Sequence, residues 1–165
     1  MFQIGDKVVY PNHGAGIIES IEEKEILGKT RSYYVMRISI GDMKVMVPLD
    51  SIKEIGLRQV IDEEGFKKVM TILKDARSPM PSNWNRRYRD NMEKIKSGCI
   101  YRVAEVVRNL MLRDREKGLS SGEKKMLDYA RRILVSELVL AKNCDEDRAL
   151  SMIENVLGRK SQAYC

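Results

Sequence analysis

The chain has 165 residues, of which 43% are hydrophobic and 33% are charged, and its formal net charge is +6. This composition is that of a soluble globular protein with one domain or two small ones, and no apolar run approaches the roughly 20 residues that a membrane span needs. The three cysteines, Cys99, Cys144 and Cys165, are far apart and form no metal-binding pattern, so we expect a reduced cytoplasmic chain with no metal and no cofactor.

The first ~56 residues contain short runs that alternate polar and apolar residues and end at turn signals. The runs cover residues 6–10, 16–22, 24–27, 32–40 and 43–47. The turn signals are Pro11-Asn12-His13-Gly14, Gly28-Lys29, Gly41-Asp42 and Pro48. Several short strands joined by tight turns predict a small antiparallel β-barrel over residues 1–56.

From Asp62 onward, apolar residues recur with the helical period of 3.6. We expect helices from Asp62, from near Asn83, over residues 100–115 up to Gly118, from Ser120, and over residues 145–157 with Gly158 as a left-handed stop. The second half is therefore predicted to be an all-α helical domain over residues 60–165. The fold class is α+β with two domains.

The positive charge is concentrated in the helical half. Residues 1–58 contain 8 Lys and Arg against 8 Asp and Glu, whereas residues 77–132 contain 15 against 7. A basic unit attached to a neutral one is typical of a protein that binds a polyanion through one of its parts. A solvated basic surface would give the same count.

The most distinctive segment contains the only tryptophan of the chain. It reads Pro79-Met80-Pro81-Ser82-Asn83-Trp84-Asn85-Arg86-Arg87-Tyr88-Arg89. Ser82 and Asn83 after a proline predict a helix start, because their side-chain oxygens can accept hydrogen bonds from the first turn. Trp84 would then lie in that turn, beside three arginines.

Two interpretations of this tryptophan are open. An exposed ring beside Arg86, Arg87 and Arg89 is suited to inserting into a nucleic-acid groove while the guanidinium groups bind phosphates. The ring could instead begin a buried helical stripe. That stripe would comprise Trp84, Tyr88, Met92 and Ile95.

Further basic residues lie on the helix that begins at Ser120. Lys124, Lys125, Arg131 and Arg132 are predicted opposite its apolar positions. This arrangement is a common solvent-exposed face and also a workable path for phosphate contacts, and we include Lys124 and Lys125 among the candidate DNA-binding residues.

Residue types suited to catalysis are sparse. His13 is the only histidine and lies in a turn rich in Gly and Asn, where we expect a structural role. Gly14 and Gly16 are not followed by the lysine or the helix of a phosphate-binding loop. These observations argue against an enzyme.

Several sequence blocks belong together. They are Gly5-Asp6-x-Val8-Val9-Tyr10-Pro11-x-His13-Gly14-Ala15-Gly16, Tyr33-Tyr34-Val35, Met43-Lys44-Val45-Met46-Val47-Pro48, Gly56-Leu57-Arg58, Asn83-Trp84-x-Arg86-Arg87-Tyr88, Val103-Ala104-Glu105-Val106-Val107-Arg108 and Leu119-Ser120-x-Gly122-Glu123-Lys124-x-Met126-Leu127. In this order and at these distances, they resemble the CarD/CdnL family of bacterial transcription regulators over nearly the whole chain.

The resemblance implies a Tudor-like or SH3-like N-terminal domain that binds the β subunit of bacterial RNA polymerase. It also implies a helical domain that contacts promoter DNA just upstream of the melted bubble. In relatives the matching tryptophan inserts into the minor groove there and helps to keep the promoter open, which favours the wedge interpretation of Trp84. The DNA contacts carried over by position are Trp84, Arg86, Arg87 and Arg89.

The resemblance also points to two polymerase-binding positions, Lys24 and Met46. Some relatives carry arginine at both. Lysine keeps the positive charge and methionine does not, so we expect an apolar contact at Met46.

The leading hypothesis is a monomeric, non-enzymatic transcription regulator, located in the cytoplasm and associated with the nucleoid through RNA polymerase, with no membrane contact. The alternative is an architectural DNA-binding protein without a dedicated polymerase contact. The neutral first half argues against it, because a pure DNA binder gains little from an uncharged barrel.

Overall fold

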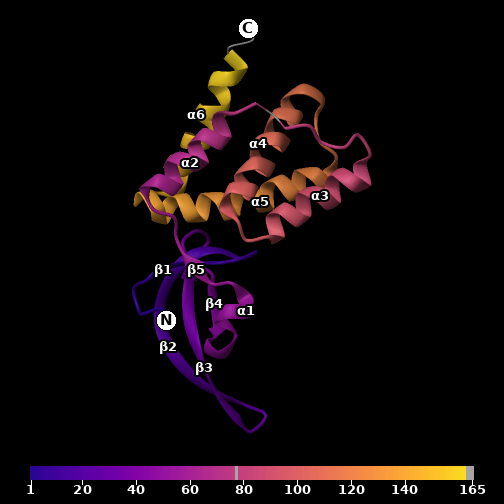
Figure 1. Cartoon of the computed structure of the whole chain (residues 1–165). Coiled ribbons are helices and arrows are strands. Elements are labelled where there is room, and N and C mark those ends of the chain that lie inside the picture. Colours follow the sequence, from indigo (N-terminus) through magenta and orange to yellow (C-terminus); the bar gives the residue numbers. More distant parts are fainter. Residues whose placement is uncertain (77, 163–165) are drawn as a thin grey trace.

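A sheet-containing domain and a bundle of helices are stacked end to end in the computed structural model, which describes residues 1–76 and 78–162 (Figure 1). The strands are β1 (Lys7–Tyr10), β2 (Gly14–Ile26), β3 (Lys29–Ile38), β4 (Lys44–Pro48) and β5 (Arg58–Gln59). The helices are η1 (Leu49–Ser51), α1 (Ile52–Ile55), α2 (Glu63–Lys74), α3 (Trp84–Lys96), α4 (Ile100–Lys117), α5 (Ser121–Lys142) and α6 (Glu146–Gln162). The predicted α+β class is confirmed. None of the described helices is long and apolar enough to cross a membrane.

The β-domain, which comprises β1–β5 with η1 and α1, is one antiparallel sheet in the order β4-β3-β2-β1-β5. Each strand pairs with its neighbour in sequence, except that β5 returns to pair with β1 at Val8 and Val9. β4 and β5 are therefore the two edge strands. The sheet thus includes Arg58 and Gln59, beyond the turn at Gly56.

A long hairpin of β2 and β3 projects from the β-domain away from the helices (Figure 1). The two runs predicted at residues 16–22 and 24–27 are joined in the single strand β2, and a bulge between Ile18 and Ser20 shifts the register. Gly16 allows the strands to approach closely, because a Cβ there would lie 2.2 Å from the carbonyl oxygen of Arg37. Most buried side chains of the sheet lie outside the end of this hairpin, where residues 21–31 are all exposed.

The helical domain, α2–α6, begins three of its helices at the predicted caps. Asp62 accepts a hydrogen bond from the Gly65 N–H, Asn83 accepts one from Arg86, and Ser120 accepts one from Glu123. Each cap satisfies one N–H group that has no partner within its helix. These local signals therefore placed the helix starts correctly.

The predicted end of the last helix was wrong. Helix α6 continues through Gly158 to Gln162, and Gly158 is not among the glycines with positive φ. A glycine inside a helix costs only about 1 kcal/mol relative to alanine, so its presence alone does not end a helix. Packing of Ile153 and Leu157, both fully buried, holds α6 in place up to that point.

The middle of α5 lies against the β-domain. Ser136 Oγ accepts a hydrogen bond from the Ala15 N–H at 2.9 Å, and the carbonyl oxygen of Ser136 accepts one from Ser39 Oγ at 2.8 Å. Gly14 makes room for this contact, since a Cβ there would lie 3.0 Å from Ser136 Oγ. One helical residue therefore bonds two segments of the sheet.

The next residue of α5, Glu137, is 0% exposed and makes a second junction. Its carboxylate accepts two hydrogen bonds from the Arg58 guanidinium, at 2.8 and 2.7 Å, and one from the Ile61 N–H at 2.9 Å. These bonds hold the segment that connects the two domains. Together, Ser136 and Glu137 join the β-domain and the helical domain into one unit.

Candidate nucleic-acid interface

Trp84 is the first residue of α3, and the residue is 41% exposed. Asn83 caps this helix, as the sequence predicted. The other end of α3 faces the β-domain, since Gly98, just past it, lies against Pro11. The tryptophan is therefore at the end of α3 that is distant from the β-domain (Figure 1).

The indole ring is exposed but held in place. Its Nε1–H donates to Ser120 Oγ at 2.9 Å, and its face stacks on Tyr88 with 5.1 Å between ring centroids. It also lies over the first turn of α5, where a Cβ on Gly122 would come within 3.2 Å of Trp84 Cζ2. The helical stripe that the sequence suggested is real further along α3, where Ile95 is buried, but the ring lies at its exposed end.

Arg86 and Arg89 are both exposed on α3. Arg89 lines a hollow of about 510 Å³ along α3. The residues that line it are Trp84, Asn85, Tyr88, Arg89, Met92 and Lys96. Reasoning from the sequence missed Lys96, although it follows Trp84 at three successive four-residue steps and is therefore on the same side of the helix.

Arg87 does not fit its predicted role as a DNA contact, because the residue is only 4% exposed. Its Nε and Nη2 groups donate to the carboxylate of Glu123 at 2.8 and 3.1 Å. Its Nη1 group donates to the carbonyl oxygens of Pro81 and Ser82 at 3.2 and 3.1 Å. A phosphate contact would require this network to break.

The partner of Arg87, Glu123, is 2% exposed. The hydrogen bonds from Arg87 lower the pKa of the Glu123 carboxyl below its usual value, against the opposing effect of burial. The same pairing raises the pKa of Arg87. Both groups are therefore charged near neutral pH, and the ion pair is a buried link between α3 and α5.

The two candidate lysines of α5 are exposed, but they do not extend the hollow beside Trp84. Lys125 lines a separate hollow with His13 and Arg132, between α5 and the β-domain. Arg131 forms an ion pair with Asp128 at 2.8 Å. The basic residues of α5 are thus distributed over more than one face.

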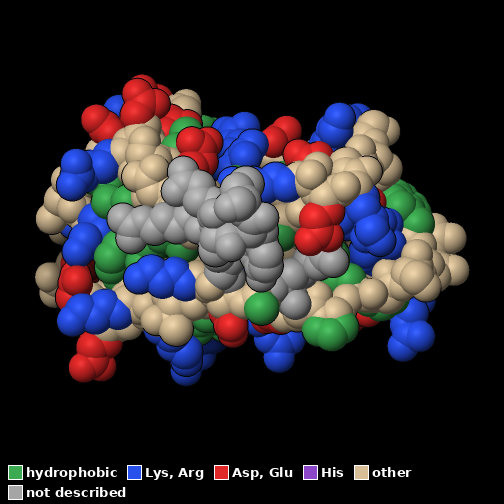
Figure 2. Space-filling model, turned by 90° about the horizontal axis from the view of Figure 1, so that it is seen from above, with side chains coloured by type: hydrophobic (Ala, Val, Ile, Leu, Met, Phe, Trp, Pro, Cys, Tyr) green, Lys and Arg blue, Asp and Glu red, His purple; other side chains and the backbone are tan. Residues whose placement is uncertain are grey.

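The face of the helical domain opposite the β-domain carries charges of both signs. Figure 2 shows Lys and Arg side chains around its margins, with Asp and Glu side chains among them. The excess positive charge of residues 77–132 is therefore not gathered into one patch among the described residues of that face. The basic residues that share a surface with the exposed ring are Arg89 and Lys96.

The two candidate polymerase-binding residues lie in the β-domain. Met46 is half-buried on the edge strand β4, opposite Val35 of β3. Lys24 is exposed in the projecting hairpin, opposite Arg31. Both residues are therefore in a different domain from Trp84, which begins α3 (Figure 1).

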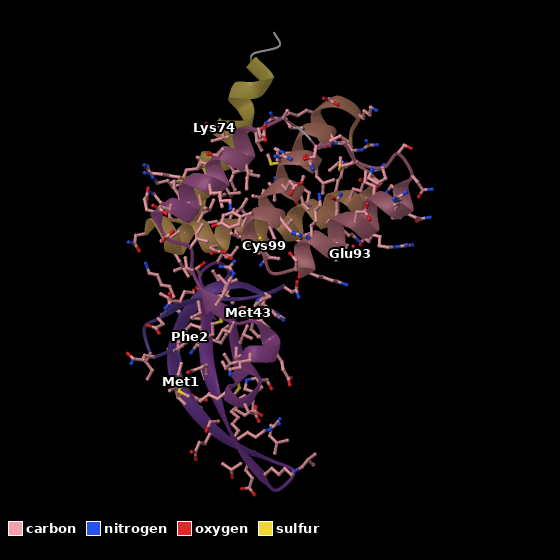
Figure 3. The ribbon with its side chains drawn as sticks, viewed as in Figure 1. Met1, Phe2, Met43, Lys74, Glu93 and Cys99 are labelled. Carbon is pink, nitrogen blue, oxygen red and sulfur yellow. The ribbon has the colours of Figure 1, made fainter. Side chains whose placement is uncertain are left out.

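Within the described residues, no three His, Cys, Asp or Glu side chains are grouped so as to hold a metal ion. Cys99 and Cys144 are free, and Cys165 lies outside the described residues. Cys99 is on the side of the helical domain that faces the β-domain (Figure 3). His13 packs its ring against Tyr10 in the turn between β1 and β2, in agreement with a structural role.

A small antiparallel sheet followed by a helical domain is the arrangement that two family models of transcription regulators match, one on each domain. The CarD-like/TRCF RID domain matches residues 2–61, and the CarD C-terminal domain matches residues 68–154. The chain belongs to the CarD family.

A particular relative is YdeB of Bacillus subtilis (strain 168), named as a candidate transcription factor. It is 48% identical over 151 residues, which are 92% of this chain and 99% of that protein. Two solved structures from Myxococcus xanthus match the β-domain. The 72-residue N-terminal domain of CarD is 36% identical over 36% of this chain and 79% of that one, with a TM-score of 0.32. The structure of CdnLNt is 41% identical over 38% of this chain and 89% of that one, with a TM-score of 0.34.

Proposed function

We propose that this transcription regulator binds the β subunit of RNA polymerase through its β-domain and stabilises the open promoter complex with Trp84. The ring inserts into the minor groove at the upstream edge of the bubble, while Arg86, Arg89 and Lys96 bind neighbouring phosphates. The observation that carries this proposal is an exposed ring fixed at a capped helix start beside cationic side chains. An apolar wedge of this kind favours unstacked base steps.

The polymerase contact is assigned to the edge strand β4. An edge strand can accept a strand from a partner, with main-chain hydrogen bonds giving affinity and alternate side chains giving selectivity. Met46 supplies an apolar contact on that strand, and Lys24 of the neighbouring hairpin adds a charge. We further propose that the functional units are the β-domain, which extends past the predicted boundary at residue 56 to include β5, and the helical domain, and that the protein is a cytoplasmic monomer.

The decisive experiment measures open-complex half-life with the full-length protein. Trp84→Ala should shorten the half-life roughly ten-fold, equivalent to about 1.4 kcal/mol, with polymerase binding unchanged. The unfolding free energy should fall by only about 1 kcal/mol, because the ring is at the surface. An unchanged half-life would reject the wedge.

A second variant tests the polymerase contact. Met46→Glu should weaken binding to polymerase by placing a charge in an apolar contact, whereas Gln59→Glu, on the opposite edge strand, should not. Equal binding of polymerase by both variants would reject the assignment to Met46, and no binding of polymerase by the original chain would leave the architectural alternative.

A further inference from the structure

The first turn of α5 surrounds the indole ring of Trp84 on two sides. Ser120 caps this turn and at the same time accepts the indole N–H at 2.9 Å. The Cζ2 atom of the ring would lie 3.2 Å from a Cβ on Gly122, which is closer than an ordinary van der Waals contact. The cap of one helix is thus also the support for a side chain of another.

The same turn also holds the backbone that leads to Trp84. Glu123 binds the guanidinium of Arg87, and that guanidinium donates to the carbonyl oxygens of Pro81 and Ser82. Ser120 Oγ lies 3.4 Å from Glu123 Oε1, so the two attachments meet at one carboxylate. The ring is fixed through its own N–H and through the chain that precedes it.

The start of this segment is held by α4. Arg108 is 3% exposed and donates to Ser78 Oγ at 2.6 Å and to the carbonyl oxygen of Ile72 at 3.0 Å. Asn109 accepts a hydrogen bond from the Ser78 N–H at 3.1 Å. Two buried arginines therefore bind the segment between α2 and α3 near its two ends.

We propose that Ser120, Gly122 and Glu123 form a seat that sets the orientation of Trp84 before DNA is bound. They are positioning residues, and this inference rests on the function proposed above for the ring. A side chain that is already held loses less conformational freedom when it binds, so a preset wedge inserts more favourably than a mobile one. Glycine at position 122 lets the ring pack closely on α5, because a Cβ there would lie only 3.2 Å from Trp84 Cζ2.

Gly122→Ala separates this role from stability. Alanine favours a helix over glycine, so the variant should fold with little change in stability, but its methyl group, 3.2 Å from Trp84 Cζ2, shifts the ring from its position on α5. Gly158→Ala is the matched control, because Gly158 is also helical and a Cβ there meets nothing within 4 Å. We expect the open-complex half-life to fall several-fold with Gly122→Ala and to stay unchanged with Gly158→Ala.

Ser120→Ala tests the hydrogen bond to the ring, with Ser120→Thr as the variant that keeps the hydroxyl. Ser120→Ala also removes a helix cap, so Asp62→Ala, which removes the cap of α2 far from the ring, controls for that loss. We expect a several-fold shorter half-life only for Ser120→Ala, and recovery with Ser120→Thr.

Fluorescence of the free protein gives a readout that is independent of transcription, because Trp84 is the only tryptophan. Acrylamide quenching should increase with Gly122→Ala and Ser120→Ala and stay unchanged with Gly158→Ala and Asp62→Ala. If quenching is unchanged in all four, no seat exists, whatever the half-lives show. If Trp84→Ala shortens the half-life but the seat variants leave it unchanged or lengthen it, the proposed function stands and the seat is rejected.

Discussion

The two ends of this molecule differ in whether an ion pair is buried or exposed to water. At the helical end, the ion pair of Arg87 and Glu123 is buried, with side chains 5% and 2% exposed. At the β end, the ion pair of Arg31 and Asp50 spans 3.3 Å with both side chains more than half exposed. Water screens the exposed pair and leaves it weak, whereas the buried pair cannot lose one partner without leaving a desolvated charge. The helical end therefore has a buried ion pair that fixes its geometry, and the β end presents an edge strand and exposed charged side chains.

The largest effect should come from breaking the buried pair. Glu123→Ala should lower the unfolding free energy by about 3–5 kcal/mol, because Arg87 would stay buried without a counter-charge. Asp50→Ala, the matched change at the β end, should cost less than about 1 kcal/mol. Urea unfolding of the two variants measures both, and equal losses would show that burial does not distinguish the two ends.

The acid stability of the chain should depend on the same carboxylate. The pKa of Glu123 is lower in the folded protein than in the unfolded chain, so its stabilising contribution is present above the unfolded value near 4.3 and is lost as pH falls through the folded value. The double variant Arg87→Met with Glu123→Leu should flatten this part of the pH profile. The unfolding free energy of the original chain and of the double variant is measured between pH 6 and the acid limit of folding. An equal dependence of this free energy on pH in both proteins would contradict the prediction.

Replacing the tryptophan by a smaller ring sharpens the description of the helical end. Trp84→Phe keeps an apolar wedge but loses the hydrogen bond to Ser120. We expect an open-complex half-life between those of the original chain and Trp84→Ala. If Phe restores the full half-life, the indole N–H has no part in the function.

The smallest effect concerns a single phosphate contact. Lys96→Ala should reduce the slope of log affinity for DNA against log salt by about 1, because one fewer counterion is released. Lys53→Ala, an exposed lysine in α1 of the β-domain, should leave the slope unchanged. DNA titrations at several salt concentrations measure this difference, which is absent if Lys96 does not touch the backbone.

Local signals in the sequence were sufficient for most of the fold. The caps at Asn83 and Ser120 and the turn at Gly28 act over a few residues, so they can be read directly. Gly158 misled the prediction because a left-handed stop depends on the residues after the glycine and on the packing of the helix before it. At such positions tertiary packing overrides the low helix propensity of glycine.

The candidate site was predictable only in part. The tryptophan and its helix start were evident, and the helical spacing of Lys96 offered a signal that was overlooked. The burial of Arg87 was not visible, because its partner Glu123 is 36 residues away and adjacent arginines look alike in sequence. Which arginine faces water depends on tertiary packing that no local pattern encodes.

The junction at Ser136 and Glu137 has a consequence for how the two ends act together. Two modules on a flexible tether would search for their targets separately, with an effective concentration set by the length of the tether. Here one helix, α5, is bonded to the sheet through Ser136 and Glu137 and supports the tryptophan at its own beginning. If the β-domain binds polymerase as proposed, the ring is confined to one small volume, and even a weak DNA contact would be occupied. The position at which the protein contacts a promoter would then be set by where the polymerase is bound and not by the base sequence.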